Sequence, residues 1–336
     1  MNAEAASVPA RPLSVLLVAG EASGDAHAAE FVAEFRRLAP SASFRGVGGE
    51  GARSSGMETL VDMREVATMG LTEVASRGRA ILRAYRRIRR EIREGRPDLL
   101  VLIDFPEFNL ALAGVAHRCG VPVLYYVSPQ VWAWRRGRVK KILRRVDRLA
   151  AIFPFEKDVY GRSDKVAFVG HPAIDRVLAT ASPTATLSCL GLDPAKRVVT
   201  ILPGSRKHEV EHLLPEMIGA LERLAPARDL QFVLGLAQTI PRGLVERFVS
   251  SANISVRIVE QDVHDLIAAS ALVIAASGTV TLETAVLGRP MVIVYKVSRT
   301  TFFFARLLVR VPFIGMANLI AGRRIVPELI QDEATA

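Results

Sequence analysis

The sequence predicts an α/β protein built from two doubly wound, Rossmann-like domains. Three observations predict it. Short, continuous apolar segments recur along the 336 residues, longer segments with helical periodicity separate them, and the apolar segments form two series with a break between them. Uninterrupted apolar strands joined by helices are typical of parallel sheets covered on both faces. A chain of this length can bury two such cores.

Each series supplies five predicted strands. The first series comprises Val15–Ala19, Leu99–Ile103, Val123–Val127, Leu149–Phe153 and Val166–Val169. The second comprises Val198–Leu202, Gln231–Leu234, Val256–Val259, Leu272–Ala275 and Met291–Tyr295. The break between them, Pro172 to Pro194, is rich in Ala, Thr, Ser and Pro. We therefore expect domains at residues 1–172 and 196–336, joined by a linker at 173–195.

The amino-acid composition limits which partners the protein can have and in which cellular compartment it can work. Half of the residues are hydrophobic and 23% are charged, which indicates a folded protein, and the net charge is +10. That charge fits an anionic partner, whether nucleic acid, lipid surface or phosphorylated substrate, and equally fits a solvated Arg-rich surface. Cys119 and Cys189 are far apart, as expected of reduced thiols. Residues 1–12 lack a signal-peptide pattern and no apolar segment is long enough to span a bilayer. We expect a cytosolic or peripheral membrane protein.

Two glycine-bearing turns in the second half point to a bound phosphate. The apolar run 271–275 ends at a turn that opens a helix, and the turn and the helix contain Ser277, Gly278, Thr279 and Glu283. Free N–H groups and the helix dipole make such an N-terminus an anion site, and a carboxylate one turn later can bind a ribose. A second turn, with Gly204, Ser205 and Arg206, also follows an apolar strand. Arg206 can bind a diphosphate bidentately or simply start a surface helix. Together they favour a nucleotide-sugar donor.

Polar residues follow the strands of the first half as well, where ligands of parallel α/β sheets bind. Ser23 and Asp25 lie in a Gly-Glu-Ala-Ser-Gly-Asp loop and fit either a binding loop or a helix cap. Asp104 follows a buried strand, where an acid is costly unless it is paired or used. Trp132 and Arg135 fit a groove for an apolar substrate or a plug at the domain edge. His171 stands at the expected domain junction, and its role is open between structure and catalysis.

The sequence contains two basic segments, which we interpret differently. In 80–94 an apolar face alternates with many arginines, which favours a solvated surface helix. The segment 295–324 fits either a buried helix and loop or an amphipathic surface that enters lipid head groups. The residues expected to contact the membrane there are Phe302, Phe303, Phe304, Arg306, Leu307 and Arg310.

Several kinds of site have no counterpart in the sequence. We find no Cys-x-x-Cys or Walker A spacing, and no Asp-x-Asp pair of the kind that holds a metal on a nucleotide diphosphate. We therefore expect no cofactor and no required metal, with helix N-termini and Arg balancing the charge of the leaving group.

Ten segments in order along residues 14–330 resemble the lipid-A-disaccharide synthase family. The most specific are the Gly-Glu-Ala-Ser-Gly-Asp string at 20–25 and Ser-Pro-Gln-Val-Trp-Ala-Trp at 128–134. The others are 46–49, 69–74, 104–109, 153–156, 169–172, 202–206, 277–283 and 318–323. The glycine turns alone are less specific, because many nucleotide-sugar enzymes share them.

The resemblance implies an inverting GT-B glycosyltransferase whose two domains face across a cleft, with the acceptor on the N-terminal side and the donor on the C-terminal side. The donor would be UDP-2,3-diacylglucosamine, the acceptor 2,3-diacylglucosamine 1-phosphate, and the product a β-1,6-linked disaccharide of lipid A in Gram-negative bacteria. Asp104 would be the general base, Arg206 and the helix at Gly278 would stabilise the diphosphate, and Glu283 would hold the ribose. Asn318 and Arg323 would orient donor or acceptor.

The resemblance also implies an anionic membrane surface at the inner face of the inner membrane as a partner, no nucleic acid, and a possible homodimer. The family's terminal helices, which follow the position of Gln331, are expected to be lacking here. The rival within the fold is a UDP-N-acetylglucosamine 2-epimerase, which needs no Trp-rich basic groove such as 131–138. The rival outside enzymes is an anionic-lipid-binding protein, which would explain the charge but not the strand-end loops.

Overall fold

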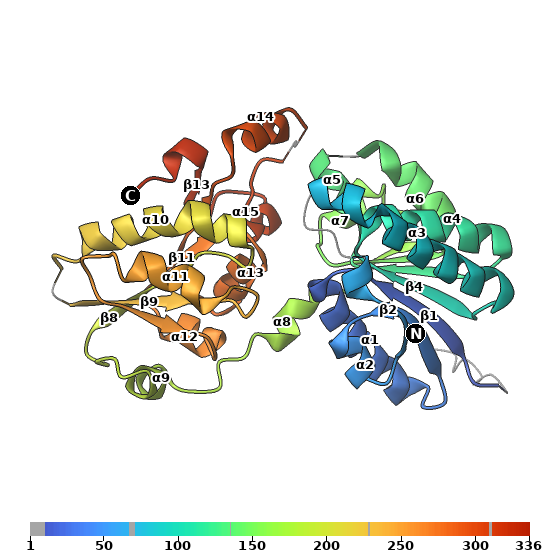
Figure 1. The fold of residues 1–336 in the computed structure, drawn as a ribbon, viewed down its shortest axis with the longest axis horizontal. Helices are drawn as coiled ribbons and strands as arrows, with labels where there is room; N and C mark the ends of the chain where they lie inside the picture. The colour runs from blue at the N-terminus through green and yellow to red at the C-terminus, as the bar shows by residue number, and fades with distance from the viewer. Residues whose placement is uncertain (1–10, 67–70, 135, 228, 309–310) are drawn as a thin grey trace. The chain divides into compact units, whose positions relative to one another are not determined.

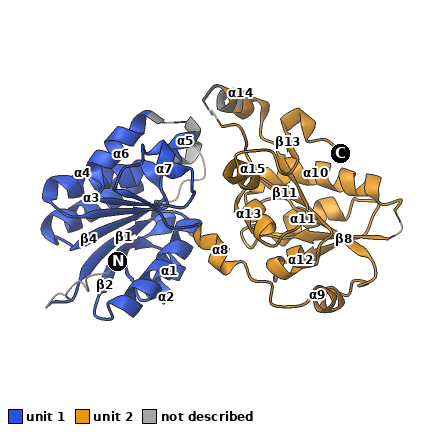
Figure 2. Ribbon diagram, turned by 180° about the vertical axis from the view of Figure 1, so that it is seen from behind, with its two compact units in different colours: residues 1–170 blue, residues 171–336 orange. Residues whose placement is uncertain are grey.

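A computed structural model describes residues 11–66, 71–134, 136–227, 229–308 and 311–336. The chain divides into two compact units, residues 1–170 and residues 171–336, coloured separately in Figure 2. Each unit contains one parallel sheet and the helices that cover it, so the predicted fold class is confirmed.

Unit 1 is built on a seven-stranded sheet with the order β3-β2-β1-β4-β5-β6-β7, all neighbours parallel. The strands are β1 (Ser14–Ala19), β2 (Ser43–Gly48), β3 (Glu58–Asp62), β4 (Leu99–Ile103), β5 (Val123–Tyr126), β6 (Arg148–Ala151) and β7 (Val166–Phe168). The α-helices, visible in Figure 1, are α1 (Ala22–Leu38), α2 (Glu50–Ser54), α3 (Leu71–Glu94), α4 (Pro106–Cys119), α5 (Val131–Trp134), α6 (Val139–Arg145) and α7 (Glu156–Val159).

Alternating residues of β1 feed two separate cores on the two faces of this sheet. Leu16 and Val18 pack with α3, α4 and α6, whereas Val15 and Leu17 pack with α1 and α2. This alternation is the two-residue period of a strand buried on both sides. On α3, Ile88 and Ile92 are fully buried, as the periodicity of 80–94 predicts.

Unit 2 repeats the arrangement with six strands in the order β10-β9-β8-β11-β12-β13, again all parallel. The strands are β8 (Arg197–Leu202), β9 (Leu230–Gly235), β10 (Val256–Val259), β11 (Leu272–Ala276), β12 (Met291–Tyr295) and β13 (Glu328–Ile330). The α-helices are α8 (Pro172–Arg176), α9 (Pro183–Cys189), α10 (Lys207–Leu224), α11 (Arg242–Val249), α12 (Val263–Ala269), α13 (Thr279–Val286), α14 (Arg299–Leu308) and α15 (Met316–Ala321). Val199 and Ile201 of β8 pack towards α10 and α11. On the other face of the strand, Val198 and Leu202 pack towards α9, α12 and α13.

The order of the strands reverses once in each sheet, and this decides where a ligand can bind. The first strand of each unit has the second strand on one side and the fourth on the other, namely β1 between β2 and β4, and β8 between β9 and β11. In open α/β sheets a crevice opens beyond the carboxyl ends of the strands at such a switch point. We therefore expect a ligand of each unit at the loops after β1 and β4 or after β8 and β11.

The predicted linker at 173–195 has structure of its own. It contains α8 and α9, both within unit 2, with α9 packed on α12 and α8 packed on α13. Within the described residues no helix is both long and apolar enough to cross a membrane.

Candidate functional site

Asp104 is the first residue after β4, at the switch point of unit 1. It is partly buried, and burial, together with the nearby charge of Glu21, raises its pKa to about 6. A carboxyl with a pKa near neutrality suits general-base chemistry, because it is ionised at the working pH and still holds a proton well. A pKa raised in this way is unlike that of an ordinary turn acceptor.

The Asp25 side chain acts as a helix cap, one of the two roles expected of this loop. Its carboxylate is buried and accepts hydrogen bonds from the backbone N–H groups of Gly49 (2.6 Å), Gly51 (2.9 Å) and Ala52 (3.2 Å). It therefore ties α1 to the start of α2, and it caps a helix 25 residues further along the chain instead of its own. Ser23 is exposed in the first turn of α1.

Trp132 is buried in a cluster of aromatic residues. Its indole packs edge-on against Phe153 and Phe155, and Nε1 donates to Oε1 of Glu156 at 3.3 Å. Glu156 is itself buried and also accepts from Ser128 Oγ and from two backbone N–H groups, those of residues 152 and 153. This carboxylate joins the loops after β5 and β6. Arg135 lies outside the described residues.

In unit 2 the turn after β8 places Arg206 at the N-terminus of α10. Gly204 has φ +114°, a conformation that favours glycine, and a Cβ there would lie 2.7 Å from the Glu209 carboxylate. Arg206 is 63% exposed and donates to Glu209 Oε1 at 2.9 Å. The backbone oxygen of Ser205 accepts from Thr239 Oγ1 at 2.6 Å. Glu209 thus orients a guanidinium that remains accessible.

The turn after β11 leads into α13. Ser277 Oγ donates to the carbonyl of Ile314 at 3.0 Å, and Thr279 is exposed at the first position of the helix. Gly278 has extended backbone angles that any residue adopts, and a Cβ built there would meet nothing within 4 Å. Neither backbone strain nor packing within the described structure requires glycine here, so the space beside Gly278 is open to a ligand.

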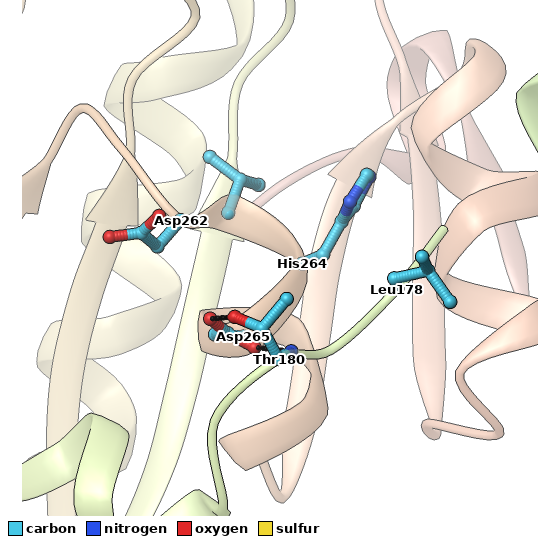
Figure 3. A pocket seen from close by; sticks show the side chains of 6 residues that line it. Leu178, Thr180, Asp262, His264 and Asp265 are labelled. Atoms are coloured by element: carbon cyan, nitrogen blue, oxygen red, sulfur yellow. Dashed lines mark hydrogen bonds between the residues drawn. The ribbon is translucent and has the colours of Figure 1, made fainter. Parts of the chain in front are cut away.

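Glu283, one turn into α13, lies beside a residue that sequence reasoning missed. The distance from His264 Nε2 to Glu283 Oε2 is 3.6 Å, and both side chains are partly exposed. His264 also lines a pocket of about 290 Å³ together with Leu178, Thr180, Asp262, Val263 and Asp265 (Figure 3). The missed signal is the His-Asp pair in the first turn of α12, the helix that follows β10.

Asp265 fixes the wall of this pocket. Its carboxylate accepts from Thr180 N (2.6 Å), Thr180 Oγ1 (2.9 Å) and Ala181 N (3.1 Å), as Figure 3 shows for Thr180. These hydrogen bonds, led by that from Ala181, lower the Asp265 pKa. The segment that enters unit 2 is therefore tied to α12 beside the pocket.

Asn318 is fully buried and its amide is already engaged. Nδ2 donates to Val326 O (2.9 Å) and Glu328 Oε1 (2.7 Å), and Oδ1 accepts from the N–H groups of Ile325 (2.7 Å) and Val326 (3.0 Å). It holds the loop between α15 and β13, so its effect on a ligand must pass through that loop. Arg323, in the same loop, is exposed.

His171 caps a short helix. Its Nδ1 accepts from Ala173 N at 3.1 Å at the start of α8. Burial, and secondarily the charge of Arg176, lowers its pKa to about 4, so the ring is neutral at pH 7 with its proton on Nε2. This geometry favours the structural interpretation of His171.

The predicted membrane segment, 295–324, contains α14. Phe303 is 62% exposed, Arg306 is exposed and Phe302 is partly buried. The side chains of Phe304 and Leu307, and Arg310 altogether, lie outside the described residues. Among the residues that are described, no group of three His, Cys, Asp or Glu side chains is placed to hold a metal ion.

Comparison with solved structures agrees with this architecture. A UDP-GlcNAc 2-epimerase from Neisseria meningitidis bound to UDP-GlcNAc superposes with a TM-score of 0.60 at 15% identity, covering 92% of this chain and 90% of that one. The calicheamicin glycosyltransferase CalG4 gives a TM-score of 0.60 at 13% identity, covering 96% and 86%. At such identities the likeness shows the fold alone, the two-sheet GT-B arrangement.

Sequence comparison is more specific. The lipid-A-disaccharide synthase of Geobacter sulfurreducens is 48% identical over 324 residues, which are 96% of this chain and 84% of that protein. The family model described as lipid-A-disaccharide synthetase matches residues 15–336, a span that includes the loops of both switch points. A match of this extent and identity shows that the chain belongs to the lipid-A-disaccharide synthase family.

Proposed function

We propose that this chain condenses UDP-2,3-diacylglucosamine with 2,3-diacylglucosamine 1-phosphate, with inversion, to give the β-1,6-linked disaccharide 1-phosphate and UDP. Unit 1 would take the acceptor and unit 2 the donor. The observation that carries the proposal is the chemistry at the two switch points: Asp104, with its raised pKa, in one unit, and in the other the exposed Arg206 and the open helix N-terminus at Gly278. Family membership supplies the substrate class.

Asp104 would act as the general base. Its carboxylate takes the proton of the acceptor 6-hydroxyl as that oxygen attacks the anomeric carbon of the donor. The carbon–oxygen bond to the diphosphate breaks on the opposite face, and the electron pair leaves with UDP. With a pKa of about 6 the group is ionised above pH 7 and is more basic than an exposed aspartate.

Unit 2 would stabilise the departing diphosphate. The N–H groups at the start of α13 and the guanidinium of Arg206 are preorganised donors for negative charge. The open space beside Gly278 allows a phosphate to approach the backbone. Glu283 would accept hydrogen bonds from the ribose, with His264 next to it.

The test is a direct assay with both diacylglucosamine substrates, read as release of UDP and formation of disaccharide. Asp104→Asn is nearly isosteric and should lower kcat by roughly 100-fold or more. Glu107→Gln is the matched control: this exposed carboxylate lies three residues further on and should leave kcat unchanged. Near-normal turnover of Asp104→Asn, or no disaccharide from the unchanged chain, would refute the proposal.

We also propose that the protein works at an anionic membrane surface, on the inner face of the inner membrane. On α3, Leu82 is 46% exposed and stands among Arg79, Arg83 and Arg86, which line a groove of about 470 Å³. On α14, Phe303 and Arg306 offer the same combination. Basic and apolar side chains that alternate on a helix fit phosphate head groups and the adjacent acyl region.

A further inference from the structure

The turn that carries Asp104 has an unusual backbone. Asp104 and Phe105 both have φ +46°, in the left-handed region that side chains other than glycine rarely adopt. Two such residues in succession persist only where surrounding contacts hold them, and strain of this kind concentrates at functional sites. Contacts from β5 and α4 hold this turn.

Two buried side chains donate hydrogen bonds to it. Tyr125 Oη donates to the carbonyl of Asp104 at 2.6 Å, and Asn109 Nδ2 donates to the same carbonyl at 2.8 Å and to that of Ile103 at 3.1 Å. Both side chains are fully buried. The Asp104 N–H in turn donates to Tyr126 O at 3.3 Å, so both backbone groups of Asp104 are held by β5 or α4.

We propose that Tyr125 and Asn109 are positioning residues that lock the Asp104 carbonyl and so keep the Asp104 carboxylate turned into its buried position. The inference rests on the proposed role of Asp104 as general base. Burial raises the pKa of Tyr125 well above its usual value, so its hydroxyl remains a donor throughout the working pH range. Neither residue touches the reacting atoms, and each acts through the backbone of Asp104.

Tyr125→Phe is the sharpest probe, because it removes one donor and keeps the buried ring. A relaxed turn exposes the Asp104 carboxyl, so its pKa falls from about 6 towards the ordinary value and the base is misaligned. We expect kcat to fall ~10- to 100-fold with KM for the UDP-sugar unchanged. The acid limb of the pH profile of kcat/KM should move to lower pH. The midpoint of this limb does not depend on the fraction of folded protein, so it can be measured even if the variant is less stable.

Tyr160→Phe is the matched control. Tyr160 is equally buried in unit 1, and its hydroxyl donates to the carbonyl of Pro129 at 3.4 Å, in the loop after β5 and not in the Asp104 turn. This variant should keep both kcat and the acid limb. If Tyr125→Phe also keeps both, or loses kcat with an unmoved acid limb, the positioning role is wrong.

A double variant separates this inference from the proposed function. If Tyr125 works only through Asp104, then Tyr125→Phe should cost nothing further in an Asp104→Asn background. Additive losses would overturn the positioning role. Full turnover of Asp104→Asn alone would instead overturn the assignment of Asp104 as the base. If Asp104→Asn is inactive and Tyr125→Phe is unaffected, the assignment of the base holds and only the positioning role of Tyr125 is rejected.

Discussion

The ring of Phe105 lies directly over Gly20, so that a Cβ added to Gly20 would approach the ring to 2.4 Å. The loops after β1 and β4, which meet at the switch point of unit 1, are therefore in contact through a glycine and an aromatic ring. Because Phe105 follows Asp104 directly, this contact also bears on where the candidate base lies.

Gly20→Ala should push Phe105 aside and with it the Asp104 turn. We expect a loss of stability of roughly 1–3 kcal/mol, as for other overpacked sites, and a lower kcat. Gly78→Ala on α3 is the control: a Cβ there meets nothing within 4 Å, and alanine favours a helix by ~0.5–1 kcal/mol. Thermal melting and turnover measured on both variants test the contact. If Gly20→Ala melts at the same temperature as the unchanged protein, the loop relaxes without cost.

Asp104→Asn should stabilise the protein at neutral pH. In the folded state the Asp104 pKa is about 6 and in the unfolded chain it is near 3.8. The folded state thus holds the proton more tightly, and its stability falls as pH rises from about 4 to 6. Above pH 6 the ionised group costs about 2–3 kcal/mol relative to a neutral one. The gain of Asp104→Asn in unfolding free energy should be present at pH 8 and absent near pH 3.5. Denaturant unfolding at the two pH values measures it, and a gain independent of pH would contradict the raised pKa.

Glu283→Ala should weaken UDP binding more than acceptor binding. Loss of a charged hydrogen-bond acceptor corresponds to roughly 10- to 100-fold in Kd. Calorimetry with UDP alone measures the affinity of the nucleotide in the absence of the acceptor. Glu246→Ala, an exposed carboxylate of the same unit paired with Arg242, should bind UDP normally. Equal affinity of the two variants would remove Glu283 from the nucleotide site.

Activity should survive chelation of divalent cations. The sequence lacks the Asp-x-Asp pair, and the charge of the diphosphate can be balanced by the α13 N-terminus and Arg206. Turnover in excess EDTA should equal turnover in magnesium. A complete loss in EDTA that magnesium reverses would mean that a metal carries this charge.

The protein should bind anionic bilayers through α14 in a manner that salt weakens but does not abolish. Each basic residue near the surface contributes ~1 kcal/mol that salt screens, whereas apolar burial is not screened. Changing Phe302, Phe303 and Phe304 to serine should remove the salt-resistant part while UDP binding persists. Liposome sedimentation at low and high salt, beside circular dichroism, tests this. Unfolding of the variant would show that the aromatic residues belong to the core.

Ten of the strands were predictable because most of their residues are apolar. The three that were missed lack this signal: β2 contains Arg45 and two glycines, β3 is only partly buried, and β13 has three residues. The switch-point loops were predictable for the same reason, since parallel strands bring their carboxyl ends to one edge.

The roles of polar residues within those loops were less predictable. Asp25 bonds to residues 24 to 27 positions away, and Asn318 to a strand that was itself missed. No local pattern distinguishes a carboxylate or amide that binds a ligand from one that caps a distant backbone. His264 and Asp265, in the first turn of α12, were missed because the segment that joins β10 to this helix contains no glycine.

Gly278 sets a limit on engineering this enzyme. Serine is a better residue than glycine at a helix N-cap, and at Gly278 the space and the backbone angles would both accept it. A search for stabilising substitutions would therefore choose Gly278→Ser early. Under the proposed function the added side chain would occupy the volume that the diphosphate needs, so the gain in robustness would come at the expense of donor binding. Thermostabilisation of this protein should leave that position alone.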